Sequence, residues 1–165
     1  MKVALGLGAN VGDGPGTLRA AVADLSRVDG LRLTAISSVY RTAPVGGVDQ
    51  DDFWNMVVVA DCALPADALG EAVHRIEDGH GRTRTVRWGP RTLDIDVLAY
   101  GDTTSAEESL TLPHPRAHER AFVLVPWAEA DPDAVLPGHG RVADLACRMD
   151  AAGVRRLGLP RIELP

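Results

Sequence analysis

Six segments of the chain carry a regular pattern of apolar residues. In four short segments, apolar residues alternate with polar ones or follow one another without interruption, which is typical of strands. Two longer segments repeat apolar residues every three or four positions, which predicts amphipathic helices. The strands are predicted over 2–8, 31–41, 53–62 and 93–100, and the helices over 17–28 and 65–79.

The ends of the two predicted helices carry recognisable signals. Thr17 is the expected N-cap of the first helix and Gly30 its stop, while Pro65 opens the second helix and Gly79 ends it. The order strand, helix, strand, strand, helix, strand predicts an α+β fold with a ferredoxin-like βαββαβ core. The rest of the chain, 101–165, contains several prolines and is expected to add shorter C-terminal elements.

Composition favours a single domain over residues 1–165. A chain of 165 residues with 45% apolar side chains can bury one core and is too short for two domains of ordinary size. Its longest apolar runs, 56–60 and 121–125, fall short of the roughly 20 residues that cross a bilayer. The N-terminus leads directly into the first strand, so we expect a cytoplasmic protein without membrane association. Cys62 and Cys147 are then expected to stay reduced.

The charge balance limits what the chain can bind. A formal net charge of −6 argues against a general nucleic-acid-binding surface, which needs clustered positive charge. Lys2 is the only lysine among 17 basic residues, which argues against a lysine-based phosphate loop or covalent lysine catalysis. Gly6 and Gly8 lack the spacing of a dinucleotide-binding fingerprint. An anionic ligand must therefore be small and bound by arginine.

Asp94 and Asp96 are the strongest chemical signal in the sequence. Because they are two residues apart on a predicted strand, their carboxylates share one face and lie roughly 6–7 Å apart along the backbone. Hard oxygen ligands on a stiff element suit one or two Mg²⁺ ions, which bridge to substrate phosphates. The alternative is a pair of solvent-facing acids, although aspartate is disfavoured within strands.

A loop rich in arginine precedes these aspartates. Residues 79–92 show no apolar period and contain Arg82, Arg84, Arg87 and Arg91. Guanidinium groups match phosphate oxygens, so this loop is a candidate for binding a polyphosphate and closing over it. An isolated arginine-rich loop is more often a solvated surface, but the neighbouring aspartates favour the phosphate site.

Phe53 and Asn55 share one face of the third predicted strand. The ring can stack on a flat heterocycle while the amide offers a donor and an acceptor to its edge. The alternatives are an ordinary core ring and a satisfied buried amide. His114 and His118 have the spacing of a helical zinc pair, but no cysteine or further histidine supports it. His114 is better explained as a phosphate donor or a helix cap.

Several of these residues belong to a motif that resembles the signature of a known enzyme family. The segment 87–98, Arg-Trp-Gly-Pro-Arg-Thr-Leu-Asp-Ile-Asp-Val-Leu, is similar to that of the 6-hydroxymethyl-7,8-dihydropterin pyrophosphokinase family of folate biosynthesis. Further blocks similar to the family occur in the family's order over most of the chain. They are 8–13, 39–44, 53–55, 112–114 and 120–122.

The resemblance implies an activity and assigns roles to residues. The protein would act on two small molecules, transferring pyrophosphate from ATP to the hydroxymethyl group of 6-hydroxymethyl-7,8-dihydropterin and releasing AMP. Separately from the resemblance, we expect a monomer. Asp94 and Asp96 would bind two Mg²⁺ ions and act in catalysis with Arg82 and Arg91. The pterin would contact Thr42, Pro44, Val45, Phe53, Asn55, Trp88 and Phe122. ATP would contact Glu77, Arg84, Arg91, Leu98, His114 and Arg120.

The sequence leaves two kinds of question open. Pro115 stands where many family members carry an aromatic residue, and Ser109 where an arginine can occur, so the nucleotide contacts are less defined than the metal site. A ferredoxin-like module that binds RNA or a small ligand would not need the aspartate pair, and its RNA version lacks the expected aromatic strand signature. Nucleotidyl transfer to another acceptor would keep the aspartates but release pyrophosphate.

Overall fold

The computed structural model of the chain describes residues 1–43, 50–81 and 92–165. In this part of the chain, an antiparallel sheet, two small hairpins, four α-helices and one 3-10 helix form a mixed α/β fold. The strands of the main sheet are β1 (Lys2–Ala9), β2 (Leu31–Ile36), β3 (Tyr40–Thr42), β4 (Phe53–Cys62), β5 (Asp94–Tyr100) and β10 (Val154–Arg156). The helices are α1 (Gly14–Ser26), α2 (Ala66–Gly79), the 3-10 helix Ala117–Glu119, α3 (Ala121–Ala130) and α4 (Val142–Cys147). The hairpins pair β6 (Ser105–Glu107) with β7 (Leu110–Leu112), and β8 (Val135–Leu136) with β9 (Gly140–Arg141).

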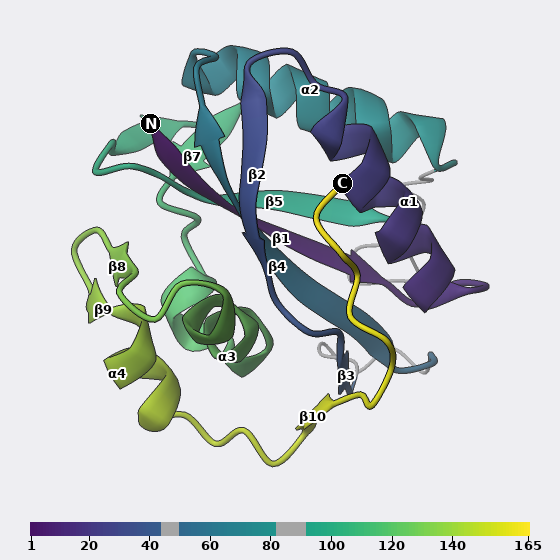
Figure 1. Cartoon of the computed structure of the whole chain (residues 1–165). Helices are drawn as coiled ribbons and strands as arrows, with labels where there is room; N and C mark the ends of the chain where they lie inside the picture. The colour runs from purple at the N-terminus through teal and green to yellow at the C-terminus, as the bar shows by residue number, and fades with distance from the viewer. Residues whose placement is uncertain (44–49, 82–91) are drawn as a thin grey trace.

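The main sheet runs through the middle of the molecule, with α1 and α2 on one face and α3 on the other (Figure 1). Its hydrogen-bonded neighbours follow the order β10, β3, β4, β1, β5, and β2 also pairs with β4. The four longest strands therefore lie in the order β2, β4, β1, β5, all antiparallel to their neighbours.

Both faces of this sheet bury apolar side chains. Successive residues of a strand point to opposite faces, so Val58 packs in the cluster beneath α1 and α2, and its neighbour Val57 packs in the cluster beside α3. The same division separates Ile95 from Leu98 on β5. Burial on both faces fixes which side chains of β4 and β5 can reach a site on the α3 side.

Three of the four predicted strands are confirmed within one residue at each end, but the segment 31–41 is not a single strand. It divides into β2 and β3, which pair with successive parts of β4. Between the two pairings, the three residues 37–39 pass only two residues of β4, 56 and 57. Ser37 fills the gap, because its amide donates to the Val57 carbonyl and its hydroxyl accepts from the Val57 amide, each at 2.9 Å.

The helix boundaries are partly as predicted. The helix α2 follows Pro65 and ends at Gly79, as expected. The prediction of Thr17 as the N-cap of α1 is wrong, because the Asp13 carboxylate accepts a first-turn backbone N–H at 3.0 Å and the helix starts directly after it. Gly30 does not stop α1 but adopts a positive φ of 86° in the turn that leads to β2. None of the helices in the described ranges has the length and apolar character that a bilayer crossing requires.

The C-terminal segment adds β10 to the sheet, which the sequence pattern did not predict. The strand β10 pairs with β3, and Arg156 lies opposite Tyr40. Glu129, near the end of α3, accepts hydrogen bonds from the Ser38 amide at 3.1 Å and the Ser38 hydroxyl at 2.7 Å. It also accepts from the Tyr40 hydroxyl at 2.5 Å and the Arg161 guanidinium at 2.9 Å. The Glu129 carboxylate thus connects α3, the start of β3 and the C-terminal segment.

These contacts determine the charge of both acidic groups. Burial alone would raise the pKa of Glu129, but hydrogen bonds from Tyr40, Ser38 and Arg161 outweigh it and lower the pKa from 4.5 to about 2. Burial raises the pKa of Tyr40 to about 12, and its hydrogen bond to Glu129 acts in the same direction. At neutral pH, the ionised Glu129 carboxylate therefore accepts a hydrogen bond from the neutral Tyr40 phenol, which keeps its proton.

We expect Glu129→Gln to lower the free energy of unfolding by about 1–2 kcal/mol at neutral pH, because charge-assisted hydrogen bonds are lost and the arginine contacts are partly screened. Since the folded-state pKa lies below the unfolded value, this contribution is complete above pH 4.5 and is lost as the pH falls towards 2. Urea unfolding of both proteins between neutral pH and about pH 3 measures the difference, which should shrink in acid. A difference independent of pH would contradict the assignment.

Candidate active site

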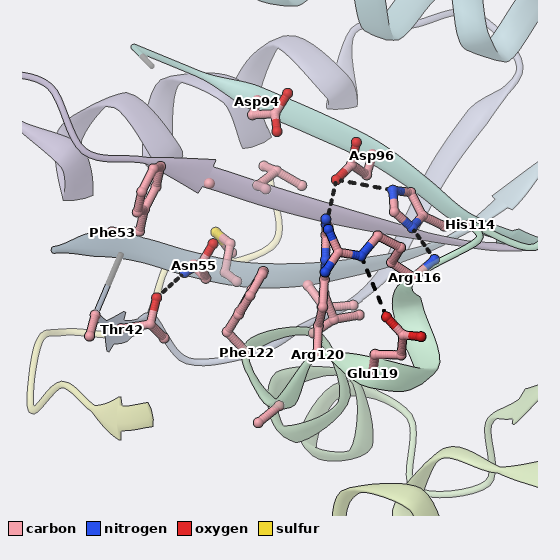
Figure 2. A pocket seen from close by; sticks show the side chains of 18 residues that line it. Thr42, Phe53, Asn55, Asp94, Asp96, His114, Arg116, Glu119, Arg120 and Phe122 are labelled. Atoms are coloured by element: carbon pink, nitrogen blue, oxygen red, sulfur yellow. Dashed lines mark hydrogen bonds and ion pairs between the residues drawn. The ribbon is translucent and has the colours of Figure 1, made fainter. Parts of the chain in front are cut away.

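A cavity of about 550 Å³ lies on the α3 side of the sheet. Its walls come from β1, β3, β4 and β5, from the segment 114–120 and from the first turn of α3 (Figure 2). The cavity brings together eight of the residues that were predicted to bind metal, phosphate or pterin. They are Thr42, Phe53, Asn55, Asp94, Asp96, His114, Arg120 and Phe122.

Two glycines of β1 form the floor between the two sides of this cavity. Gly8 lies opposite Asn55 on β4 and also opposite Asp94 on β5, while Gly6 lies opposite Asp96. A Cβ atom at Gly8 would lie 2.8 Å from Asn55 Oδ1, so a side chain there would collide with the amide. Because neighbouring strands are about 4.8 Å apart, the backbones of Asn55 and Asp94 face each other across a strip about 10 Å wide.

The aspartates reach the cavity from β5. Asp94 and Asp96 both line it (Figure 2), whereas Leu93, Ile95 and Val97 are buried in the cluster beneath α1 and α2. The predicted alternation of this strand is therefore confirmed. One face of β5 supplies packing, and the other presents two carboxylates.

Two basic side chains approach these carboxylates from the segment 114–120. Nε2 of His114 lies 3.7 Å, and Nη1 of Arg120 3.9 Å, from Oδ2 of Asp96 (Figure 2). The His114 amide donates to the Leu98 carbonyl at 2.9 Å, which attaches the segment to β5. The acidic strand and a cationic segment thus face the same space.

His114 is a neutral hydrogen-bond donor in this setting. Burial, followed by the positive charge of Arg120, lowers its pKa to about 4. Its Nδ1 accepts a hydrogen bond from the Arg116 amide at 3.2 Å, so the proton of the neutral ring is on Nε2. That N–H can donate to an anionic ligand bound beside Asp96.

The opposite side of the cavity combines aromatic rings with an amide. Asn55 is buried, and its Nδ2 donates to the Thr42 hydroxyl at 2.6 Å. Phe53 from β4 and Phe122 from α3 lie on either side of Asn55 (Figure 2), and Cζ of Arg120 is 5.6 Å from the centroid of the Phe122 ring. Two rings and a polar edge can receive a flat heterocycle.

Arg116 and Glu119 also line the cavity, although neither was predicted to do so. Nε of Arg116 lies 3.4 Å from Oε2 of Glu119. The spacing of Arg116 and Arg120 around a 3-10 turn brings both guanidinium groups to one side, but a single turn leaves no periodic signal in the sequence. The charged residues that follow His114, at 116, 119 and 120, are the feature of the sequence that could have indicated this wall of the cavity.

Two predicted ATP contacts do not line this cavity. Glu77, on α2, is 1% exposed, and its Oε1 accepts a hydrogen bond from the Ile95 amide at 2.7 Å. Leu98 is fully buried in the cluster beside α3. Glu77 therefore supports β5 at the residue between Asp94 and Asp96.

The other predicted residues lie outside the described ranges, and their roles stay predictions. The same holds for the arginine-rich loop and its expected closure over ATP. The residues concerned are Pro44, Val45, Arg82, Arg84, Trp88 and Arg91.

The two aspartates are suitable donors for Mg²⁺. In the described part of the chain, no three His, Cys, Asp or Glu side chains gather closely enough to hold a metal ion by protein ligands alone. Mg²⁺ usually takes one or two carboxylates and completes its shell with water and substrate phosphates. Asp94 and Asp96, adjacent on one strand face and open to a cavity, fit that requirement.

Comparison with known sequences finds a family and several relatives. The family described as 7,8-dihydro-6-hydroxymethylpterin-pyrophosphokinase (HPPK) matches residues 4–132. A protein of Methylorubrum extorquens is 46% identical over 153 residues, which cover 93% of this chain and 96% of that protein. A protein of Bacillus subtilis is 46% identical over 125 residues, covering 76% and 75%. Both are named 2-amino-4-hydroxy-6-hydroxymethyldihydropteridine pyrophosphokinase.

Comparison with solved structures supports the fold. The wild-type HPPK-DHPS protein of Plasmodium falciparum matches with a TM-score of 0.65 at 15% identity, covering 89% of this chain and 41% of that one. A triple mutant of the same protein matches with a TM-score of 0.69 and 44% coverage, so the chain spans about two fifths of these longer chains. The match over residues 4–132, with relatives at 46% identity, establishes that the chain belongs to the 7,8-dihydro-6-hydroxymethylpterin-pyrophosphokinase family.

Proposed function

We propose that this protein transfers the pyrophosphoryl group of ATP to the hydroxymethyl oxygen of 6-hydroxymethyl-7,8-dihydropterin and releases AMP, a step of folate biosynthesis. One observation carries the proposal: a carboxylate pair suited to Mg²⁺ and ATP faces a wall suited to a flat heterocycle across two glycines. Membership of the pyrophosphokinase family agrees with it. A module that only binds RNA or senses a ligand would not need the two aspartates.

The pterin is assigned to the aromatic side of the cavity. Phe53 and Phe122 enclose its ring system, while Asn55 and the Thr42 region bind its polar edge. Such an arrangement selects for a heterocycle whose donors and acceptors match the amide, because an unmatched edge would leave buried polar groups unpaired. Pro44, Val45 and Trp88 complete the predicted subsite.

ATP and two Mg²⁺ ions are assigned to the aspartate side. Asp94 and Asp96 hold the metal ions, and His114 and Arg120 contact phosphate oxygens. Arg116 is added to this set because it lines the same wall. The remaining predicted contacts of ATP are Glu77, Arg82, Arg84, Arg91 and Leu98.

The reaction is an in-line substitution at the β-phosphorus of ATP. A new bond forms from the hydroxymethyl oxygen to this phosphorus and the hydroxyl proton passes to solvent, while the bond to the oxygen shared with the α-phosphate breaks and AMP leaves. Bound Mg²⁺ would neutralise charge on the entering and leaving oxygens. No described side chain acts as a strong base, since His114 is a neutral N–H donor, and acceleration comes mainly from positioning and charge stabilisation.

The finer description of the fold is also a proposal. The order β2, β4, β1, β5, with α1 and α2 on one face, supports a ferredoxin-like core. Two apolar clusters that share one sheet support a single domain over 1–165. A monomeric state and a cytoplasmic location stay predictions.

We expect Asp94→Ala and Asp96→Ala each to lower kcat at least about a hundredfold, because loss of a catalytic cation removes several kcal/mol of transition-state stabilisation. The fold should persist, since both side chains face the cavity and the packing face of β5 is unchanged. Formation of AMP from Mg-ATP and the reduced pterin measures the effect. Release of ADP or of free pyrophosphate by the wild-type protein would instead indicate a different transfer reaction.

A matched control is Asp61→Ala, which removes a strand aspartate that pairs with Arg32 at the surface of β4. This variant should keep wild-type activity. Near-wild-type activity of either Asp94→Ala or Asp96→Ala at saturating Mg²⁺ would rule out the metal assignment.

We expect Phe53→Ala and Asn55→Ala to weaken pterin binding at least about tenfold while ATP binding changes little, since stacking and edge recognition concern the heterocycle. Calorimetric titration of each variant with the pterin and with an ATP analogue separates the two effects. Equal losses for both ligands would show general destabilisation rather than a pterin subsite.

A further inference from the structure

Glu129 and Phe122 lie at opposite ends of α3. Phe122 belongs to the first turn and lines the cavity, whereas Glu129 is the residue before the last of the helix and does not line it. A helix of ten residues is about 15 Å long, so Glu129 acts at a distance from any bound substrate. Its contacts nevertheless lead back to the cavity through β3.

The three-residue strand β3 joins the Glu129 contacts to the pterin wall. Tyr40, at its first position, donates its hydroxyl hydrogen bond to Glu129, and Thr42, at its last position, lines the cavity. Both are buried while Arg41 between them is exposed, so Tyr40 and Thr42 project from the same face. Tyr40 is also directly opposite Asn55 on β4.

Thr42 sets the orientation of the Asn55 amide. Nδ2 of Asn55 donates to the Thr42 hydroxyl at 2.6 Å, and Oδ1 lies over Gly8, where even a Cβ atom would be within 2.8 Å. A small movement of β3 would withdraw the hydroxyl and release the amide. A displacement of about 1 Å in the position of a bound substrate can lower the rate of reaction by roughly a hundredfold.

The Glu129 contacts hold the start of β3 and reach the neighbouring strand β10. Ser38, just before the strand, is bound through its amide and its hydroxyl. On the neighbouring strand β10, Nε of Arg156 donates to the Ser38 hydroxyl at 2.9 Å, and its Nη2 is 3.8 Å from Glu129. Arg156 and Arg161 lie beyond residues 4–132, which the family description covers. The C-terminal segment thus takes part in holding a strand of the cavity.

We propose that Glu129 is a positioning residue for pterin recognition, which acts through Tyr40 and Thr42 on the Asn55 amide. The inference rests on the proposed function, because the ligand that it names is the pterin. The control of the Asn55 amide by Glu129 is a property of the protein alone and can be tested without ligand. If the Glu129 contacts served stability alone, their loss would lower the free energy of unfolding without changing how the protein discriminates between heterocycles. The positioning role requires selective loss of pterin affinity.

The test compares Glu129→Ala and Tyr40→Phe with the control Asp131→Asn. Asp131 caps the same end of α3, and its carboxylate pairs with Lys2 at 3.0 Å, away from β3. Calorimetry measures the affinity for the reduced pterin, for the same bicycle with its 2-amino group replaced by oxygen, and for an ATP analogue with a methylene bridge between the α- and β-phosphates.

For Glu129→Ala, we expect affinity for the reduced pterin to fall about tenfold. The ratio of the affinities for the pterin and for its oxygen analogue should become smaller. Affinity for the ATP analogue should change less than about twofold. Tyr40→Phe should also lose affinity for the pterin and not for the ATP analogue, but the loss should be smaller. Asp131→Asn should bind all three ligands as the wild type does. If Glu129→Ala does not fold, Tyr40→Phe decides, because it removes one hydroxyl.

The side-chain amide signals of Asn55 in nuclear magnetic resonance spectra supply a readout without ligand. They should shift in Glu129→Ala and Tyr40→Phe and stay unchanged in Asp131→Asn. Unchanged Asn55 signals, or equal losses of pterin and ATP-analogue affinity, would overturn the inference. A wild-type protein that binds no pterin would overturn the proposed function instead, and the Asn55 signals would still decide whether Glu129 controls the amide.

Discussion

The register of β1 between β4 and β5 is the constraint on which the site depends. It places Gly8 beside both Asn55 and Asp94, and Gly6 beside Asp96. Because these two positions lack side chains, the central strand leaves an open strip between a carboxylate side and an amide side. A slip of β5 by one residue would turn both aspartates into the apolar cluster beneath α1 and α2, so the burial of Ile95 fixes the position of the acids.

Burial on both faces gives this register its rigidity. The packing face of β5 lies against α2, where the buried Glu77 accepts the Ile95 amide hydrogen. The other face is covered by α3 beyond the cavity, so the carboxylates stand at the border between packed and open surface. A stiff strand can hold two ligands for a cation without the entropy cost of ordering a loop.

The local charge of the site differs from that of the whole chain. The chain carries a net charge of −6, but a short segment after β7 brings Arg120 to 3.9 Å from Asp96 and places Arg116 on the wall of the same cavity. In the proposed reaction, this mixture suits a metal-bound polyphosphate, because the carboxylates attract cations and the guanidinium groups attract phosphate oxygens. The neutral His114 adds the N–H of its Nε2 as a hydrogen-bond donor beside Asp96.

Local patterns were sufficient to identify the strands that carry chemistry. The two-residue period of a strand put Asp94 with Asp96, and Phe53 with Asn55, on common faces before any partner was known. The prolines beside His114 marked it as a fixed donor, and the family motif added Arg120 and Phe122; all three residues reach the same cavity. The break between β2 and β3 was not predictable in this way, because the propensity of 31–41 favours extended structure throughout and only the register on β4 interrupts it.

Contacts between distant elements were decided by packing alone. A periodic pattern specifies which face of an element is buried, but it does not specify which partner covers that face. The family resemblance predicted Glu77 as a contact of ATP, but its hydrogen bond with the Ile95 amide could not be predicted, because it exists only where α2 lies on β5. Glu129 gave no signal at all, since its partners come from β3 and a C-terminal segment that meet only when the sheet has formed.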